Sequence, residues 1–184
     1  MLRFQSFLLL ILVCVLLIFA GCSGNKSKLP EKADISASVQ WWGSQSDDGY
    51  VYLYGEAVDK SESISKENAK ANALSATQYI EAYITSILSN IEMEASIKDT
   101  KILESSQKVI KLVSNILFSQ AVSGKSETIM VSTVDGESYK TFMQVKIPKM
   151  IIDKNLVYQI RNDENLYNRF IESGTFNALD ERVD

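Results

Sequence analysis

The stretch YVYLYGEAV, from Tyr50 to Val58, decides the fold. It is rich in aromatic and β-branched residues whose side chains alternate, which is typical of a β-strand. The residues before it, SQSDDG, are turn formers. Gly55 lies near the end of the strand, where a glycine indicates either a bulge or the close approach of another backbone. We therefore predict a strand over these residues, with one of these two features at Gly55.

The segment after this strand, from Ile64 to Ile91, has the periodicity of a helix. Its apolar stripe consists of Ala69, Ala73, Ala76, Ile80, Ile84, Ile87 and Ile91. Because the first half of the stripe is alanine, we expect that half to lie close over the sheet. A continuous helix of this length would extend roughly 42 Å, which is too long for one sheet. The isoleucine half therefore needs another partner.

A second helix is predicted in the segment that starts at Thr100, and it supplies that partner. Its apolar stripe consists of Ile102, Ser106, Val109, Val113 and Leu117, widened by Leu103, Ile110 and Ile116. An antiparallel pair of helices would cover both apolar faces.

Two further strands are predicted over residues 128–134 and 139–147, with Asp135-Gly136 as the turn of a hairpin. The second strand alternates between an apolar face and a face that carries Lys140, Gln144 and Lys146. We therefore expect one side of the sheet to face water.

The remaining residues, 148–184, are predicted to form short helices broken near Gly174. The order of elements is then β-α-α-β-β-α, followed by C-terminal helices. This order predicts an α+β fold in which a three-stranded antiparallel sheet packs on a long helical pair. We assign residues 41–184 to a single domain.

Composition excludes several classes of function. The net charge of −4 and the lack of any histidine argue against a broad nucleic-acid surface and against a serine-histidine triad. The acidic pairs Asp47-Asp48, Glu92/Glu94 and Asp163-Glu164 lie in polar stretches and are expected at the surface. We expect no enzymatic activity, no cofactor and no metal.

The motif Gly124-Lys125-Ser126 does not indicate a phosphate-binding loop. Such a loop needs a further glycine where this chain has Ser119, and it follows a strand and opens a helix. Here the motif follows a predicted helix and leads into a strand. We expect Gly124 just past the end of that helix, with Lys125 near its negative pole.

The first residues read as an export signal. Arg3 precedes a wholly apolar run from Phe7 to Ala20. As a helix this run would reach about 21 Å, short of the roughly 30 Å hydrocarbon core of a bilayer. A signal peptide over residues 1–21 therefore fits better than a permanent membrane span.

The residues that end this run, Ala20-Gly21-Cys22, resemble the bacterial lipobox, although Phe19 stands where that pattern prefers leucine. In a lipobox the cysteine sulfur receives a diacylglycerol and the cysteine becomes the new N-terminus. Two acyl chains hold a protein at a bilayer stably, whereas one holds it only marginally. The alternative is an ordinary signal peptide that leaves Cys22 as a free thiol.

The residues after the cysteine predict its destination. Ser23, in place of an aspartate, indicates export to the outer membrane. Residues 22–40 are rich in serine, lysine and small residues, so we predict a flexible tether between the lipidated N-terminus and the domain.

The central region resembles the LPP-twenty family of bacterial lipoproteins. The residues that carry the resemblance are Trp41 or Trp42, the motif Tyr52-x-x-Gly55-x-Ala57, and the helix alanines Ala69, Ala71 and Ala73. The resemblance implies an outer-membrane lipoprotein that faces the periplasm and has no established catalysis. Some relatives are flagellar lipoproteins that assemble into discs or rings beneath the outer membrane.

Two functional hypotheses follow. The first is a structural or assembly component of the bacterial envelope, anchored through acylated Cys22 and associated with itself, with an envelope partner or with the flagellum. The second is a periplasmic binding module for a small ligand or glycan that uses Trp41, Trp42 and tyrosines such as Tyr52 and Tyr54. A deep aromatic pocket would favour the second hypothesis.

Overall fold

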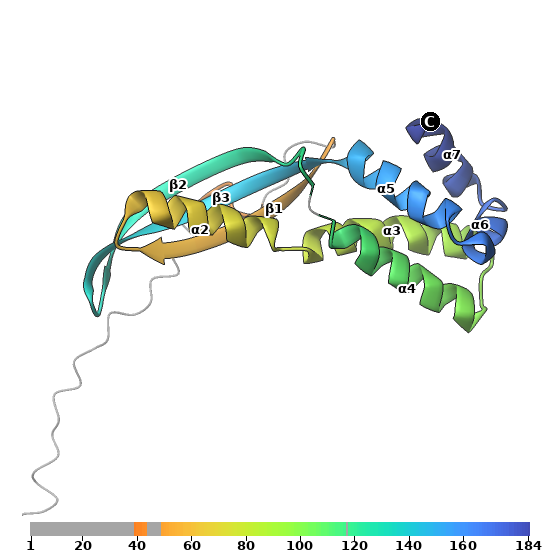
Figure 1. The fold of residues 1–184 in the computed structure, drawn as a ribbon, viewed down its shortest axis with the longest axis horizontal. Coiled ribbons are helices and arrows are strands. Elements are labelled where there is room, and N and C mark those ends of the chain that lie inside the picture. The colour runs from red at the N-terminus through yellow and green to blue at the C-terminus, as the bar shows by residue number, and fades with distance from the viewer. Residues whose placement is uncertain (1–38, 44–48, 117) are drawn as a thin grey trace, which may run out of the picture. The chain divides into compact units, whose positions relative to one another are not determined.

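The computed structural model describes residues 39–43, 49–116 and 118–184 (Figure 1). The expected signal peptide, Cys22 and most of the expected tether lie outside these residues. The elements, in chain order, are β1 (Tyr50–Asp59), α2 (Glu62–Leu74), α3 (Gln78–Glu94), α4 (Thr100–Ser114), β2 (Val122–Thr133), β3 (Gly136–Pro148), α5 (Lys149–Arg161), α6 (Glu164–Phe170) and α7 (Gly174–Val183). The predicted α+β fold is confirmed.

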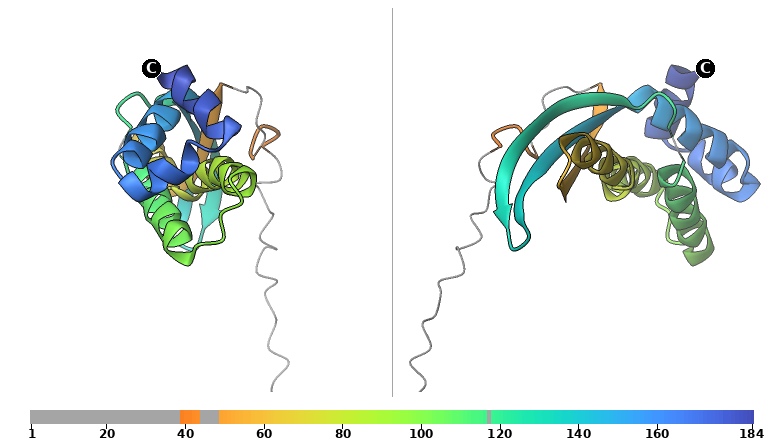
Figure 2. Two further views of the ribbon diagram at one scale, coloured as in Figure 1. Left: turned by 90° about the vertical axis from the view of Figure 1, so that its right-hand side faces the viewer. Right: turned by 60° about the vertical axis from the view of Figure 1, so that its left-hand side comes forward.

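The three strands form one antiparallel sheet in the order β1-β3-β2. β3 is central, so Gly55 of β1 lies opposite Met143 and Thr128 of β2 lies opposite Thr141. The predicted hairpin is present, but its turn lies at Val134-Asp135, one residue earlier than expected, because Thr133 pairs with Gly136. Gly136 opens β3 with a φ of +101°, which suits glycine. The long β2–β3 hairpin curves around α2 (Figure 2).

Helix α2 packs on β1 and β3, as the alanine stripe predicts. Ala69 and Ala73 are fully buried. Gly55 permits this contact, because a Cβ at that position would lie 2.5 Å from the carbonyl oxygen of Ala69 and closer still to the backbone nitrogen of Ala73. β1 pairs with β3 in unbroken register, so the glycine serves a close backbone approach and not a bulge.

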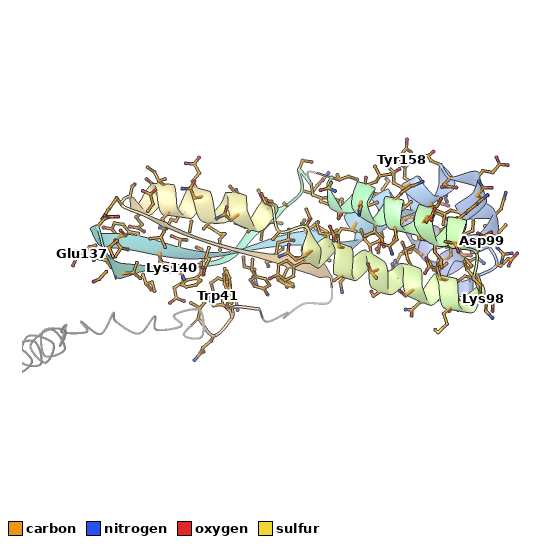
Figure 3. The ribbon with its side chains drawn as sticks, turned by 90° about the horizontal axis from the view of Figure 1, so that it is seen from below. Trp41, Lys98, Asp99, Glu137, Lys140 and Tyr158 are labelled. Carbon is orange, nitrogen blue, oxygen red and sulfur yellow. The ribbon has the colours of Figure 1, made fainter. Side chains whose placement is uncertain are left out.

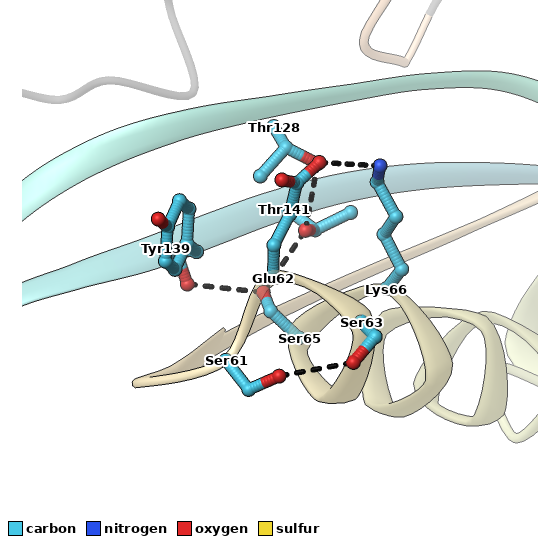
Figure 4. A network of polar contacts seen from close by, with 8 residues as sticks. All are labelled: Ser61, Glu62, Ser63, Ser65, Lys66, Thr128, Tyr139 and Thr141. Carbon is cyan, nitrogen blue, oxygen red and sulfur yellow. Dashed lines mark hydrogen bonds and ion pairs between the residues drawn. The ribbon is translucent and has the colours of Figure 1, made fainter.

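A buried chain of hydroxyl groups also holds α2 to the sheet (Figure 4). The hydroxyl of Ser65 lies 3.0 Å from the carbonyl oxygens of Ala57 and Tyr139, and 2.9 Å from the hydroxyl of Thr141. Thr141 in turn lies 3.0 Å from Thr128. One helix residue thus connects to all three strands, which satisfies polar groups that would otherwise be costly to bury.

The single helix expected from Ile64 to Ile91 is wrong, because the chain breaks into α2 and α3 at Ser75–Thr77. The Ser75 hydroxyl and backbone N–H both donate to the carbonyl of Ala71, and the backbone N–H of Thr77 turns back to Ser75. Such local hydroxyl bonds compete with the helical ladder. The stripe keeps its phase across the break, because Ala76, Ile80, Ile84 and Ile91 are buried as expected, while Leu88 is buried and Ile87 only partly so.

Helices α3 to α7 form their own cluster beyond the sheet (Figure 1). α3 contacts α4, which confirms the predicted partner, and α5 contacts both α4 and α7. The largest fully buried side chains of the cluster are those of Phe170, Phe176, Ile80, Ile84, Leu88, Ile91, Ile152 and Leu156. The isoleucine half of the original stripe therefore packs among these helices, in a hydrophobic core that is continuous with Ala69 and Ala73 of α2.

The expectation for Gly124 and Lys125 is wrong, because both residues lie in β2 and not at the end of a helix. The pairing of β2 with β3 shifts between Ser123 and Ser126. Gly124 lies against Gln144 there, and the backbone N–H of Lys125 donates to the side-chain oxygen of Gln144 at 3.4 Å. A strand irregularity at a small residue explains the glycine.

Candidate interaction surface

The face of the sheet opposite α2 carries an aromatic cluster, which we call the aromatic face. Its residues are Trp41, Trp42, Tyr50, Tyr52, Tyr54 and Phe142. Viewed from below, Trp41 and Lys140 lie on the side of the sheet away from α2 (Figure 3). Strand alternation explains this placement, because the three tyrosines of β1 occupy every second position.

The residues before β1 cover part of this face. The N–H of Trp42 donates to the carbonyl of Val39, which is itself buried. The ring of Trp42 lies 5.3 Å from that of Tyr54 and 5.2 Å, edge-on, from that of Phe142. The folded body therefore includes Val39, two residues before the expected boundary at Trp41.

The prediction that this side of the sheet faces water is wrong. Phe142 is fully buried and Gln144 is 2% exposed, although both belong to the side that was expected to be wet. The physical reason is the cover supplied by Trp42, which lies about a hundred positions away in the sequence. Lys140 and Lys146 remain half-buried at the margin, each above an aromatic ring.

The predicted interaction residues differ in their accessibility. Tyr52 and Tyr54 are buried, at 1% and 7% exposure. The side-chain amide of Gln144 donates to the Tyr54 hydroxyl at 3.3 Å, and burial raises the pKa of that hydroxyl. Trp41 and Trp42 are half-buried, with ring centres 5.9 Å apart. Trp41, Trp42 and Tyr54 are thus joined by ring contacts, whereas the ring of Tyr52 lies against that of Tyr50.

A hollow of 290 Å³ lies beside the aromatic face, where β1 meets α3. It is lined by Tyr50, Val51, Tyr79, Ala82, Tyr83 and Lys149. The ammonium of Lys149 lies 5.4 Å from the centre of the Tyr83 ring. Tyrosine, one of the residue types that the sequence associated with ligand binding, therefore lines a hollow. Two of its tyrosines come from α3 and one from β1, and Trp41 and Trp42 do not line it.

A buried carboxylate bonded to Tyr83, which lines this hollow, joins three helices. Asp153 of α5 accepts from the Tyr83 hydroxyl of α3 at 2.8 Å and from Arg182 of α7 at 2.7 Å. Burial raises the pKa of Asp153, and the bonds from Tyr83 and Arg182 oppose that shift. Burial and the bond to Asp153 raise the pKa of the Tyr83 hydroxyl, so it stays a proton donor at neutral pH. This contact fixes the C-terminal helix and was not predicted.

A second acidic residue holds the other end of α7. Glu94, at the end of α3, accepts from the Ser173 hydroxyl at 2.7 Å, the Thr175 N–H at 2.9 Å and the Thr175 hydroxyl at 2.5 Å. The carboxylate lies at the N-terminus of α7, where the positive end of the dipole of that helix also favours a negative charge. Side-chain bonds from Thr175 and Ser173 lower the pKa of Glu94 to about 2.

The other acidic pairs of the sequence have ordinary roles or lie outside the structure. Asp163 caps the N-terminus of α6 by accepting from the N–H of Leu166 at 3.1 Å. Asp47 and Asp48 fall outside the described residues.

The bonds to Glu94 predict a dependence of stability on acid pH. The folded pKa of Glu94, about 2, is lower than its ordinary value, so ionised Glu94 stabilises the fold above pH 4.5. That stability is lost as the pH falls from 4.5 to 2. Glu94→Gln should therefore flatten the fall in the free energy of unfolding over this range, measured by urea denaturation at a series of pH values.

Glu92→Gln is the matched control, because Glu92 neighbours Glu94 but makes none of these bonds. Asp153, whose pKa is raised in the folded protein, changes the free energy of unfolding with pH in the opposite direction to Glu94. It is present in both variants, so it does not affect their comparison. Equal pH profiles for Glu94→Gln and the unmodified chain would contradict the assignment.

Comparisons with protein-family models, with curated proteins and with solved structures found no match. Within residues 39–43, 49–116 and 118–184, no helix has the length and apolar character needed to span a bilayer. The same residues contain no group of three or more acidic, histidine or cysteine side chains arranged to hold a metal ion.

Proposed function

We propose that this protein is a non-enzymatic lipoprotein of the bacterial envelope, anchored to the outer membrane through acylated Cys22 and facing the periplasm. Its folded body serves as a structural or assembly component that associates with further copies or with an envelope partner. The resemblance to the LPP-twenty family extends this proposal to assemblies associated with the flagellum.

The observation that carries the proposal is the position of Cys22, directly after an apolar run that ends in Ala20-Gly21. The organisation of the folded body supports it. The residues that follow the expected tether pack on the aromatic face through Trp42. Because the rings of this face fill the space between one another, they favour a structural role over a ligand pocket.

Replacing Cys22 tests the proposal. Cys22→Ser removes the thiol that would accept the diacylglycerol, so we expect the protein to move from the membrane fraction to the soluble periplasmic fraction, or to be retained as an uncleaved precursor. The measurement is fractionation of bacteria that express the full chain, with detection by immunoblot.

Cys14→Ser is the matched control, because Cys14 lies within the apolar run and is expected to leave with it. This variant should fractionate like the unmodified chain. A Cys22→Ser protein that is processed normally and remains membrane-bound would contradict the anchor.

The second candidate function, binding of a small ligand or glycan, is favoured by one observation. The hollow next to the aromatic face presents tyrosine rings and the Lys149 ammonium, which suit the apolar face and the acidic group of a carboxylated sugar. Titration with glucuronate, followed by NMR, should then shift the signals of Tyr50, Tyr79 and Lys149. Unchanged signals at millimolar glucuronate would remove this candidate.

A further inference from the structure

β2 is an edge strand whose outer side lacks a partner in the described part of the chain. The sheet order β1-β3-β2 leaves it paired with β3 alone. Between residues 126 and 133 the pairing is regular, and most side chains are exposed. Within the described residues, no backbone hydrogen bond joins this stretch to any element except β3. In an antiparallel pair, every second residue of an edge strand directs its N–H and C=O outward.

The two halves of β2 differ in the features that prevent edge pairing. The first half contains the irregularity at Gly124, together with Lys125 and Glu127. The second half, TIMVST from Thr128 to Thr133, contains no charge, proline or glycine. Natural edge strands are usually protected by charges, proline or bulges, so an unprotected half is available for pairing with another strand.

The other edge of the sheet is organised differently. β1 carries the charged residues Glu56 and Asp59. It also contacts α3, and the rings of Tyr54 and Tyr79 lie 5.5 Å apart. Strand addition is therefore favoured at β2 over β1.

The sequence of β2 is complementary to itself. In an antiparallel pair centred on Met130, Ile129 lies opposite Val131, Thr128 lies opposite Ser132, and Met130 meets its own copy. These are apolar and hydroxyl pairs of the kind that stabilise sheets. Ile129 and Val131 also lie on one face of the sheet, because their partners in β3, Lys140 and Ser138, are two residues apart.

Charge complementarity favours the same register. This register brings Lys125 of one copy toward the hairpin turn of the other copy, where Asp135 lies. Two-fold symmetry repeats the contact at the opposite end of the paired strands. Glu127 lies opposite Thr133, so the register places no like charges against each other. The side chain of Met130, 61% exposed in the single chain, would become covered at the centre.

We propose that a second copy of this chain adds along Thr128–Thr133 of β2 in antiparallel orientation, joining two three-stranded sheets into one six-stranded sheet with two-fold symmetry. The inference rests on the proposed function, since it names the surface through which the assembly component would associate with itself.

Replacing Met130 tests this pairing. Because Met130 meets its own copy, Met130→Lys would place two ammonium groups opposite each other. We expect the unmodified full chain in detergent to sediment as a dimer and the dissociation constant of Met130→Lys to rise by at least about tenfold, a change of roughly 1.4 kcal/mol. The matched control is Met150→Lys, because Met150 on α5 is similarly exposed, at 64%, and follows the end of β3 that is remote from Thr128–Thr133. It should leave the dimer unchanged.

Crosslinking identifies the contact without depending on that variant. The photo-crosslinking residue p-benzoylphenylalanine at position 130 should link to a peptide from residues 126–134 of a second copy, identified by mass spectrometry, and at position 150 it should not. A dimer that survives Met130→Lys, with crosslinks elsewhere, would overturn the edge pairing but leave self-association intact. A chain that stays monomeric would overturn both the pairing and self-association. Membrane anchoring would be unaffected by that result, because fractionation tests it independently.

Discussion

Gly55→Ala should destabilise the protein by at least about 3 kcal/mol, or prevent folding altogether. The added Cβ would lie 2.5 Å from the carbonyl oxygen of Ala69 and 2.7 Å from the Cα of Ala73. These are backbone atoms of a helix, so no side-chain rotation relieves the contact, and α2 must move away from β1. That movement would also separate Ser65 from its partners on the strands. The free energy of unfolding from urea denaturation measures the effect.

Gly174→Ala is the matched control for that substitution. Gly174 is the first residue of α7, and a Cβ there would approach no atom closer than 3.9 Å. Alanine at a compatible helical position reduces the entropy of the unfolded chain, so we expect a gain of roughly 0.4–1 kcal/mol. A loss below about 1 kcal/mol for Gly55→Ala would show that α2 does not lie on β1 as described.

Phe142→Ala should lower the free energy of unfolding by about 3–5 kcal/mol, the usual range for a fully buried phenylalanine. The result distinguishes the covered aromatic face from the wet face that strand alternation alone predicts. On a wet face the same substitution would change stability by only about 0.5 kcal/mol.

A double-mutant cycle with Trp42→Ala identifies what covers Phe142. Because the two rings are in edge-on contact, their substitutions should be non-additive by roughly 0.5–1.5 kcal/mol. Phe170→Ala is the control, since Phe170 is equally buried but lies in the helical cluster. Its effect should add to that of Trp42→Ala within about 0.5 kcal/mol. Additivity of Trp42→Ala and Phe142→Ala would contradict the contact.

The features predicted from the sequence are those that local patterns determine. Strand alternation around Tyr52, the alanine stripe at Ala69 and Ala73, and the β2–β3 hairpin each depend on neighbouring residues. The close approach at Gly55 was only one of two alternatives, because a glycine in a strand indicates either a bulge or a close backbone contact.

The features that the sequence did not predict depend on contacts between distant residues. The cover over Phe142 comes from Trp42, and the anchors of α7 come from Glu94 and Asp153. One signal was available, because Phe142 is an aromatic residue among the polar positions of β3, and such a residue is usually buried. The end of α2 at Ser75 was missed for another reason. The apolar stripe continues across the break, and periodicity does not predict the hydrogen bond from the Ser75 hydroxyl to the backbone that accompanies it.

The most direct test of the proposed function is the mass of the mature chain, purified from bacterial membranes in detergent. Processing at a lipobox predicts a polypeptide that begins at residue 22 and carries a diacylglyceryl group on its sulfur, with or without an additional acyl chain on the new amine. A mature chain with an unmodified Cys22 thiol, or one that retains residues 1–21, would contradict it.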